Sequence, residues 1–226
     1  MVIKYGESPA WLTIITVAIL SARGPGRNRI SGRLMVMQKE NSEITLCVLV
    51  GLQCAGKTTF LAEAEKQGCT TLEWSAVIYD DLGCTIAEDR TQWFKYIGQR
   101  VKEKGPTYYP NIIFHRLIAK TGEVHVVSGA RNPTELAALL GMYSHTVVIW
   151  IEADATKRFY RAKMRSRRDT KSKFIEFIRN DHEELRGGLA DIFTQYVTYY
   201  IVNNSSSEKF RTDIIGVLER LKNRRN

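Results

Sequence analysis

Cysteine is scarce in this sequence, and its spacing argues against the sites that depend on cysteine pairs. The four cysteines stand at positions 47, 54, 69 and 84, and no two of them form a C-x-x-C pair. Structural zinc sites and disulfide-rich small folds need closely spaced pairs or a partnering histidine pattern, so neither is predicted. Dispersed cysteines are typical of a reducing compartment, and we therefore predict a cytoplasmic protein.

The sequence also lacks an obvious membrane-spanning run. The apolar stretch WLTIITVAIL, Trp11 to Leu20, is ten residues long and too short to cross a bilayer as a helix. Because a basic residue precedes it and SARG follows it, the stretch resembles the core of a signal peptide, which is the alternative interpretation. We favour an N-terminal extension over residues 1–43, partly disordered or linker, without a membrane role. It packs on the domain or precedes a start near Met35 or Met37.

Acidic residues are depleted in one segment above all. Residues 157–173 hold nine Lys and Arg against one Asp, and residues 1–43 hold six against three Glu. The remaining residues hold 18 basic and 20 acidic side chains, so the formal net charge of +9 comes mainly from a local cluster. A local cluster suits a polyphosphate ligand better than a long nucleic-acid track. The alternatives are a solvated helix face and an RNA-facing patch, so a nucleic-acid partner is not favoured.

No internal repeat is visible, and from Glu43 onward stretches typical of strands alternate with stretches typical of helices. The run ITLCVLV, residues 44–50, is mostly apolar, as expected for a strand buried on both faces of a parallel sheet. Four more strands are predicted in CTTLEW, EVHVVSG, HTVVIWIEA and YVTYYIVNN, and an amphipathic helix closes the chain. This alternation predicts a doubly wound α/β fold.

The first predicted strand leads into the pattern G-x-x-x-x-G-K-T, which begins at Gly51 and ends at Thr58. This is the P-loop (Walker A) pattern, and it requires the strand before it and the helix after it. Its glycines let backbone N–H groups converge on phosphate oxygens, while the helix adds the positive end of its dipole. In this pattern Lys57 reaches the β- and γ-phosphates and the Thr58 hydroxyl binds Mg²⁺. A purely structural turn is the alternative.

We therefore predict that the chain binds ATP and Mg²⁺, with Thr58 as the metal ligand. The fold class is predicted to be a three-layer α/β/α P-loop NTPase fold with a five-stranded parallel sheet, in a domain over residues 44–226. The predicted ATP-binding residues are Gly51, Leu52, Gln53, Cys54, Ala55, Gly56, Lys57, Thr58 and Thr59.

The segment ATKRFYRAKMRSRRD follows the fourth predicted strand and is dense in arginine. At helical spacing Arg158, Arg161 and Arg165 fall on one face. Arginine stabilises the charge on a transferring phosphoryl group because its planar fork binds oxygen atoms in pairs and stays protonated. A kinase places such residues in a lid that excludes water from the transfer. We predict an Arg-rich helical lid over about residues 155–186, with these three arginines and Lys57 as catalytic residues.

The acceptor side carries weaker signals. In VVSGARNPTE, Arg131 follows the third strand, whose carboxyl end faces the ligand crevice of a doubly wound sheet. We predict that it binds an acceptor phosphate; the alternative is a pair with Glu135. A P-loop kinase usually has an Asp at the end of a neighbouring strand, but this strand ends in Ser128. The substitutes are Asp80, predicted to bind substrate, and Asp81, predicted to be catalytic by orienting the acceptor, unless both are solvated turn residues.

Together these motifs resemble the P-loop nucleoside-monophosphate-kinase-like family, nearest to the archaeal kinase-like ATPases related to dephospho-CoA kinase and adenylate kinase. The resemblance runs from Ile44 to about Leu221 through GLQCAGKTT, VVSGARNPTE, RFYRAKMRSRRD, NDHEELRGGL and YIVNN. It departs at Ser75 to Tyr79, where the family tends to show Gly-Asp-x-x-Arg, and at Ser128. The resemblance implies ATP at the Gly-rich loop, an acceptor region at Arg131, and a lid formed by the arginine-dense segment.

These expectations predict an ATP-dependent phosphotransferase that moves the γ-phosphoryl group to a nucleotide or nucleotide-like small molecule. Tyr108 and Tyr109 are candidates to stack on an acceptor base. The competing hypothesis is a nucleotide-binding ATPase or regulatory module that lacks efficient transfer and contacts RNA through its basic segment. The departures at Ala76, Tyr79 and Ser128 favour this alternative, and no oligomeric state is predicted.

Overall fold

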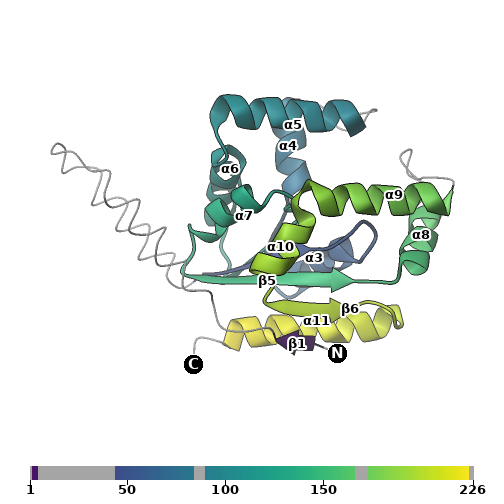
Figure 1. Ribbon diagram of the computed structural model, residues 1–226. Coiled ribbons are helices and arrows are strands. Elements are labelled where there is room, and N and C mark those ends of the chain that lie inside the picture. Colours follow the sequence, from purple (N-terminus) through teal and green to yellow (C-terminus); the bar gives the residue numbers. More distant parts are fainter. Residues whose placement is uncertain (1, 5–43, 84–89, 166–172, 224–226) are drawn as a thin grey trace.

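The fold is built around a sheet of six strands (Figure 1). The computed structural model describes residues 2–4, 44–83, 90–165 and 173–223. The strands are β1 (Val2–Lys4), β2 (Thr45–Val50), β3 (Thr70–Glu73), β4 (Val124–Ser128), β5 (His145–Glu152) and β6 (Tyr199–Val202). Their order is β1-β6-β5-β2-β4-β3, and all neighbours are parallel except β1 and β6. The predicted five-stranded parallel sheet is therefore confirmed, and β1 adds an antiparallel edge strand.

Helices cover both faces of this sheet (Figure 1). A short π-helical turn, η2 (Leu185–Leu189), joins two of them, α9 and α10. The helices are α3 (Lys57–Lys66), α4 (Trp74–Leu82), α5 (Arg90–Lys104), α6 (Tyr108–Ile118), α7 (Pro133–Leu140), α8 (Ala155–Met164), α9 (Phe174–Glu184), α10 (Ala190–Tyr196) and α11 (Ser207–Lys222).

Two apolar cores lie on the two faces of the sheet. Successive residues of β2 alternate between them: Leu46, Val48 and Val50 belong to one core, and Cys47 and Leu49 belong to the other. The first core includes residues of α4, α6 and α7, and the second includes residues of α3 and α11. Because both faces of β2 are buried, its sequence is apolar without alternation. The predicted three-layer α/β/α architecture is confirmed.

Helix α4 replaces what the sequence suggested to be a turn after β3. Trp74, Val77 and Ile78 follow the i, i+3, i+4 spacing of a helix face, and all three are buried in the first core. Burial of this face stabilises the helix, which carries Asp80 and Asp81 in its last turn. These two residues are therefore helical, not turn residues.

No helix in the described part of the chain is both long enough and apolar enough to cross a membrane. The apolar stretch Trp11 to Leu20 lies outside the described residues.

A buried carboxyl group lies in the first turn of α7. The Asn132 side chain caps this helix by accepting hydrogen bonds from the backbone N–H groups of Thr134 (2.9 Å) and Glu135 (3.3 Å). The Glu135 residue is 5% exposed, and its Oε1 has no hydrogen-bond partner among the described residues. Burial raises the pKa of Glu135 to about 7 because the charged form is poorly solvated there.

Replacing Glu135 by Gln is expected to stabilise the protein at pH 8 and to leave its stability nearly unchanged at pH 5. The pKa is higher in the folded than in the unfolded chain, so the wild-type free energy of unfolding falls as the pH rises from 4.5 through 7. This titration is worth up to about 3 kcal/mol. Urea unfolding of both proteins at the two pH values measures it, and an equal difference at both pH values would contradict it.

Candidate functional site

The candidate site begins where the chain leaves β2 and turns into α3. Gly51 and Gly56 bound this loop with φ angles of 137° and 123°, which residues with a side chain rarely adopt. A Cβ on Gly51 would lie 2.4 Å from the Ile151 carbonyl oxygen, and one on Gly56 would lie 2.5 Å from Asn203 Nδ2. Both positions therefore require glycine for space as well as for conformation.

Side chains hold the carbonyl groups at both ends of this loop. Lys57 Nζ donates hydrogen bonds to the carbonyl oxygens of Gly51 (2.7 Å) and Leu52 (2.9 Å). Asn203, which follows β6, donates from Nδ2 to the carbonyl oxygen of Ala55 at 2.7 Å. The loop is thus attached to its own helix and to a strand that lies about 150 residues later in the chain.

Two arginines of α8 contact the remaining carbonyl groups of the loop. Arg158 Nη1 approaches the carbonyl oxygen of Gln53 at 3.5 Å, and Arg161 Nη1 approaches that of Cys54 at 3.4 Å. These two hydrogen bonds are longer than those of Lys57 and Asn203, but with them each carbonyl group of the loop has a side-chain donor. All the carbonyl oxygens of residues 51–55 accept a hydrogen bond from a side chain.

The amide N–H groups of the same loop show the opposite pattern. Between residues 52 and 56, only the N–H of Ala55 makes a hydrogen bond with a described residue, to Leu52 O at 3.3 Å. Free N–H groups in succession present partial positive charge, and the start of α3 adds its dipole to them. Backbone donors that lack a partner in the protein need one from outside. The loop is therefore suited to bind an anion.

Arg158 is buried and is held by an aspartate of α9. Its Nη1 and Nη2 donate to the two carboxylate oxygens of Asp181 at 2.9 and 2.8 Å. Its Nε donates to the Ala153 carbonyl oxygen at 2.8 Å, and its guanidinium lies over the Phe177 ring at 5.4 Å. A bidentate pair with both side chains about 95% buried fixes the two partners firmly. Arg158 thus ties α8 and α9 to the loop, whereas the sequence suggested a lid arginine that faces the ligand.

The other two predicted lid arginines differ in their surroundings. Arg161 Nη2 donates to the backbone and side-chain oxygens of Asn203 at 2.9 and 3.3 Å, which links α8 to the end of β6. Burial lowers the pKa of Arg161, and the positive charge of Arg165 acts in the same direction. Arg165 lies at the end of α8 and is exposed, and its side chain makes no hydrogen bond or ion pair with the described residues. Of the three predicted lid arginines, Arg165 is therefore the one whose side chain is open to solvent.

Arg131 projects from the segment between β4 and α7 and forms an ion pair with Glu184 of α9. The distance between Arg131 Nη1 and Glu184 Oε1 is 2.7 Å, and the Glu184 side chain is buried. The acid partner of Arg131 is therefore Glu184 and not Glu135. Burial lowers the pKa of Lys57 to about 8, and the charge of Arg131 contributes in the same direction. The two cations Arg131 and Lys57 therefore lie near each other beside the loop.

Asp81 lies at the end of α4, where three side chains donate to it. The donors are Arg100 Nε at 3.1 Å, the Tyr108 hydroxyl at 2.6 Å and the Tyr109 hydroxyl at 3.2 Å. These bonds join α4 to α5 and α6. Asp81 is thus occupied, and buried Tyr109 is unable to stack on a ligand. The helical rise also carries Asp81 about 10 Å along α4 from the sheet edge.

Asp80 has one partner and remains mostly exposed. It forms an ion pair with Arg116 of α6 at 2.5 Å, and its side chain is 61% exposed. The structure therefore does not bring Asp80 and Asp81 together at the loop. Both carboxylates connect α4 to its neighbouring helices.

Three residues that shape the site received no role from the sequence. Asp181 and Glu184 lie one turn apart on the buried face of α9, and Asn203 follows β6. They stand in NDHEELRGGL and YIVNN, which carried the family resemblance only as segments. The spacing of the sequence could have indicated the burial of the two acids, because Asp181 and Glu184 are three residues apart and fall on the same helix face as the apolar Phe177.

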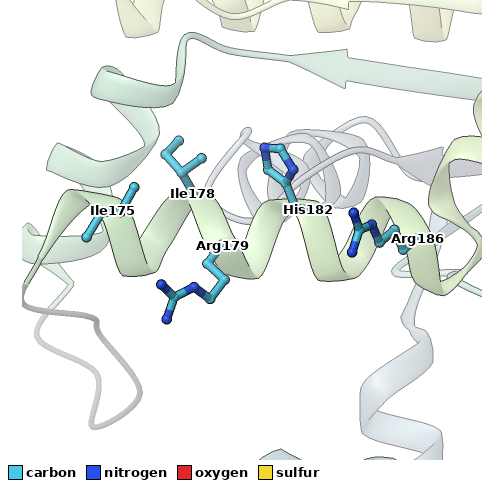
Figure 2. Close-up of a pocket in the computed structure, with 5 residues that line it drawn as sticks. All are labelled: Ile175, Ile178, Arg179, His182 and Arg186. Atoms are coloured by element: carbon cyan, nitrogen blue, oxygen red, sulfur yellow. The ribbon is translucent and has the colours of Figure 1, made fainter.

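The outer face of α9 carries a shallow pocket that is separate from the loop (Figure 2). Figure 2 shows Ile178 and His182 extending to one side of the helix and Arg179 extending to the other, while Arg186 lies across the ribbon. The lining residues of the pocket are exposed or partly exposed, whereas Asp181 on the same helix is buried, and none of them belongs to the loop. Its volume is about 290 Å³, and it is lined by Ile175, Ile178, Arg179, His182 and Arg186.

Thr58 is the residue that the sequence predicts to bind a magnesium ion. It lies in the first turn of α3 and is exposed beside the loop. The described residues contain no group of three or more His, Cys, Asp or Glu side chains that would hold a metal by themselves. Mg²⁺ does not need such a cage, because it usually keeps several waters and binds through substrate phosphates and one or two protein oxygens.

When the five parallel strands β2 to β6 are numbered 1 to 5 along the chain, their order in the sheet is 2-3-1-4-5. This order, with a Gly-rich loop after the first of these strands, is that of the α/β fold of P-loop kinases. No family model matches the chain. It is similar to a UPF0200 protein of Pyrococcus abyssi, 24% identical over 181 residues that cover 78% of this chain and 96% of that protein. A UPF0200 protein of Pyrobaculum aerophilum is 29% identical over 182 residues, covering 79% and 99%.

Solved structures support the same class of fold. Shikimate kinase from Bacteroides thetaiotaomicron gives a TM-score of 0.53 at 17% identity, over 79% of this chain and 98% of that chain. The protein TT1252 from Thermus thermophilus gives a TM-score of 0.55 at 13% identity, over 79% and 97%. The P-loop kinase-like fold is thereby confirmed. The nearer likeness to dephospho-CoA kinase and adenylate kinase stays a prediction.

Replacing Asp181 by Asn is expected to lower the free energy of unfolding by about 3–5 kcal/mol, because it leaves a buried guanidinium without its carboxylate. The matched control is Asp80→Asn, which removes an ion pair with Arg116 in which the Asp80 side chain is 61% exposed. That change is expected to cost less than about 1 kcal/mol. Urea unfolding measures both variants, and similar losses in the two would contradict the structural role of Asp181.

Proposed function

We propose that this protein is an ATP-dependent phosphotransferase. It binds ATP with Mg²⁺ at the loop between β2 and α3 and transfers the γ-phosphoryl group to a nucleotide-like small molecule. The observation that carries the proposal is the pairing pattern of the loop. The carbonyl groups of residues 51–55 are bound by side chains, while most N–H groups of the loop have no partner among the described residues, which is the arrangement that a polyphosphate needs.

In this proposal Lys57 supplies the positive charge that stabilises the γ-phosphoryl group during its transfer. In the free protein its ammonium donates to two carbonyl oxygens, which are neutral acceptors. The oxygens of a triphosphate carry charge and accept stronger hydrogen bonds, so ATP draws Lys57 from the loop to the β- and γ-phosphates. Thr58 binds Mg²⁺ through its hydroxyl, and the metal neutralises charge on the phosphates.

Arg131 and Arg165 supply the remaining positive charge in this proposal. Arg131 is partly exposed beside Lys57, and it binds an anionic group of the acceptor. Arg165 is exposed at the end of α8, and it reaches the transferring phosphoryl group from the lid. Arg158 and Arg161 act at a distance, since they keep the loop in its shape. Asp80 is exposed and remains the acidic candidate for substrate binding, whereas Asp81 holds the helices on that side.

The competing function is a nucleotide-binding module that hydrolyses ATP slowly and contacts RNA through its basic segment. The observation in its favour is the occupation of Asp81 by three donors, together with a neutral Ser128 at the end of β4. Both features leave the predicted acceptor side short of a general base.

A panel of nucleoside monophosphates and dephospho-CoA incubated with ATP and Mg²⁺ distinguishes these functions. We expect ADP release that depends on one acceptor class and that Lys57→Ala reduces by at least about a hundredfold, since Lys57 stabilises the transferred charge. The control is Lys66→Ala at the other end of α3, which should retain wild-type activity. ATP binding without acceptor stimulation across the panel would reject the kinase and favour the slow ATPase.

The lowered pKa of Lys57 predicts that ATP affinity declines at alkaline pH. Above about pH 8 the free protein loses the Lys57 charge, while bound triphosphate favours the protonated form. The association constant should therefore fall by up to about tenfold per pH unit above pH 8. Competition against a fluorescent ATP analogue between pH 6.5 and pH 9.5 measures this, with both limits set at about 1.5 units from the pKa. Lys57→Arg should flatten the profile, and a flat wild-type profile would contradict the assignment.

A further inference from the structure

Glu73 stands at the carboxyl edge of the sheet beside Ser128. It is the last residue of β3, and its Cα partner on β4 is Ser128. Residues in register on neighbouring strands point their side chains to the same face of the sheet. The next residues also lie close together, since a Cβ added to Gly129 would lie 3.6 Å from the Cβ of Trp74. A carboxylate therefore lies next to the position where a P-loop kinase usually has an Asp.

The side chain of Glu73 lies on the face that α3 covers. Thr71, two residues earlier on β3, donates its hydroxyl hydrogen to Glu65 of α3 at 3.1 Å. Because side chains alternate along a strand, Glu73 lies on the same face as Thr71. The residues of β4 on this face pack in the same core as α3. The first turn of α3 carries Thr58, so Glu73 and Thr58 are at the same edge and on the same face.

The carboxylate of Glu73 has no partner in the part of the chain that the structure describes. It makes no hydrogen bond and no ion pair there, although the residue is partly buried. The carboxylates of Asp81, Asp181 and Glu184 are each bound by an arginine. Partial burial of an unpaired carboxylate is unfavourable, so a positively charged ligand or ordered water bound to Glu73 would stabilise it in this position.

We propose that Glu73 positions the Mg²⁺ of bound ATP by accepting hydrogen bonds from water molecules around the metal. It supplies from β3 the carboxylate that Ser128 does not supply from β4. The inference rests on the proposed ATP site, and it makes Glu73 a positioning residue that acts through water. Mg²⁺ keeps several of its waters in such sites, and carboxylates that orient the outer shell strongly affect metal affinity.

The test is the effect of Mg²⁺ on ATP affinity in Glu73→Gln. The dissociation constant of ATP is measured by competition with a fluorescent ATP analogue, once with excess EDTA and once with excess Mg²⁺. In the variant, affinity in EDTA should equal that of the wild type, while the tightening by Mg²⁺ should shrink by about tenfold. Electron paramagnetic resonance of Mn²⁺ with ATP gives a second readout, in which the variant binds the metal more weakly by a similar factor.

Glu152→Gln is the matched control. Glu152 ends β5 at the same edge, but it accepts a hydrogen bond from Trp150 Nε1 at 2.7 Å and so lies on the opposite face, with the first core. This variant should keep the wild-type response to Mg²⁺. A wild-type response in Glu73→Gln, by both readouts, would overturn the inference while the ATP site stands. Absence of ATP binding by the wild type in both conditions would overturn the proposed function and the inference with it.

Discussion

The site depends on hydrogen bonds from side chains to the carbonyl groups of the loop after β2. A loop has about as many backbone acceptors as donors, so a loop that presents its N–H groups to a ligand must satisfy its carbonyl groups elsewhere. Here Lys57 binds two of them from within, while Arg158, Arg161 and Asn203 bind the others from α8 and the end of β6. These donors lie far apart in the sequence, and the sheet order brings them together. The conformation of this loop is therefore a property of the whole fold and not of the glycine pattern alone.

The loop also depends on α9, because the charge of Arg158 needs a carboxylate from that helix. A buried guanidinium is costly without a carboxylate, so the arginine that contacts Gln53 brings Asp181 with it. One turn later Glu184 binds Arg131, and Gly188 of η2 packs so tightly that a Cβ there would lie 2.7 Å from the Arg131 carbonyl oxygen. Helix α9 is thus fastened to the loop at one point and to the β4–α7 segment at another. Within the segment predicted to form a lid, α9 thus makes contacts that support the loop, and the lid itself stays a prediction.

The sequence predicted the features that depend on local patterns. The apolar run of β2 and the glycines of the loop have short-range causes, and the sheet and the anion-binding loop follow from them. Arginine density predicted a basic segment but not that Arg158 would be buried, because burial depends on Asp181, 23 residues away. Asp81 resembled a free carboxylate because its donors come from α5 and α6. The neighbourhood of Glu73 and Ser128 requires the register of two strands, which no single stretch of sequence contains.

The short strand β1 determines how much backbone the sheet exposes at the edge beside β6. An edge strand presents a row of unpaired backbone groups, which is a template for pairing with another chain. β1 pairs with β6 through the register of Val2, Ile3 and Lys4 with Ile201, Tyr200 and Tyr199, and it thereby occupies that edge. Three residues of backbone are enough to cover most of β6, which is itself only four residues long. β1 is then the edge of the sheet, and an edge strand of three residues offers little backbone for pairing with another chain, beside the strand that leads directly into Asn203.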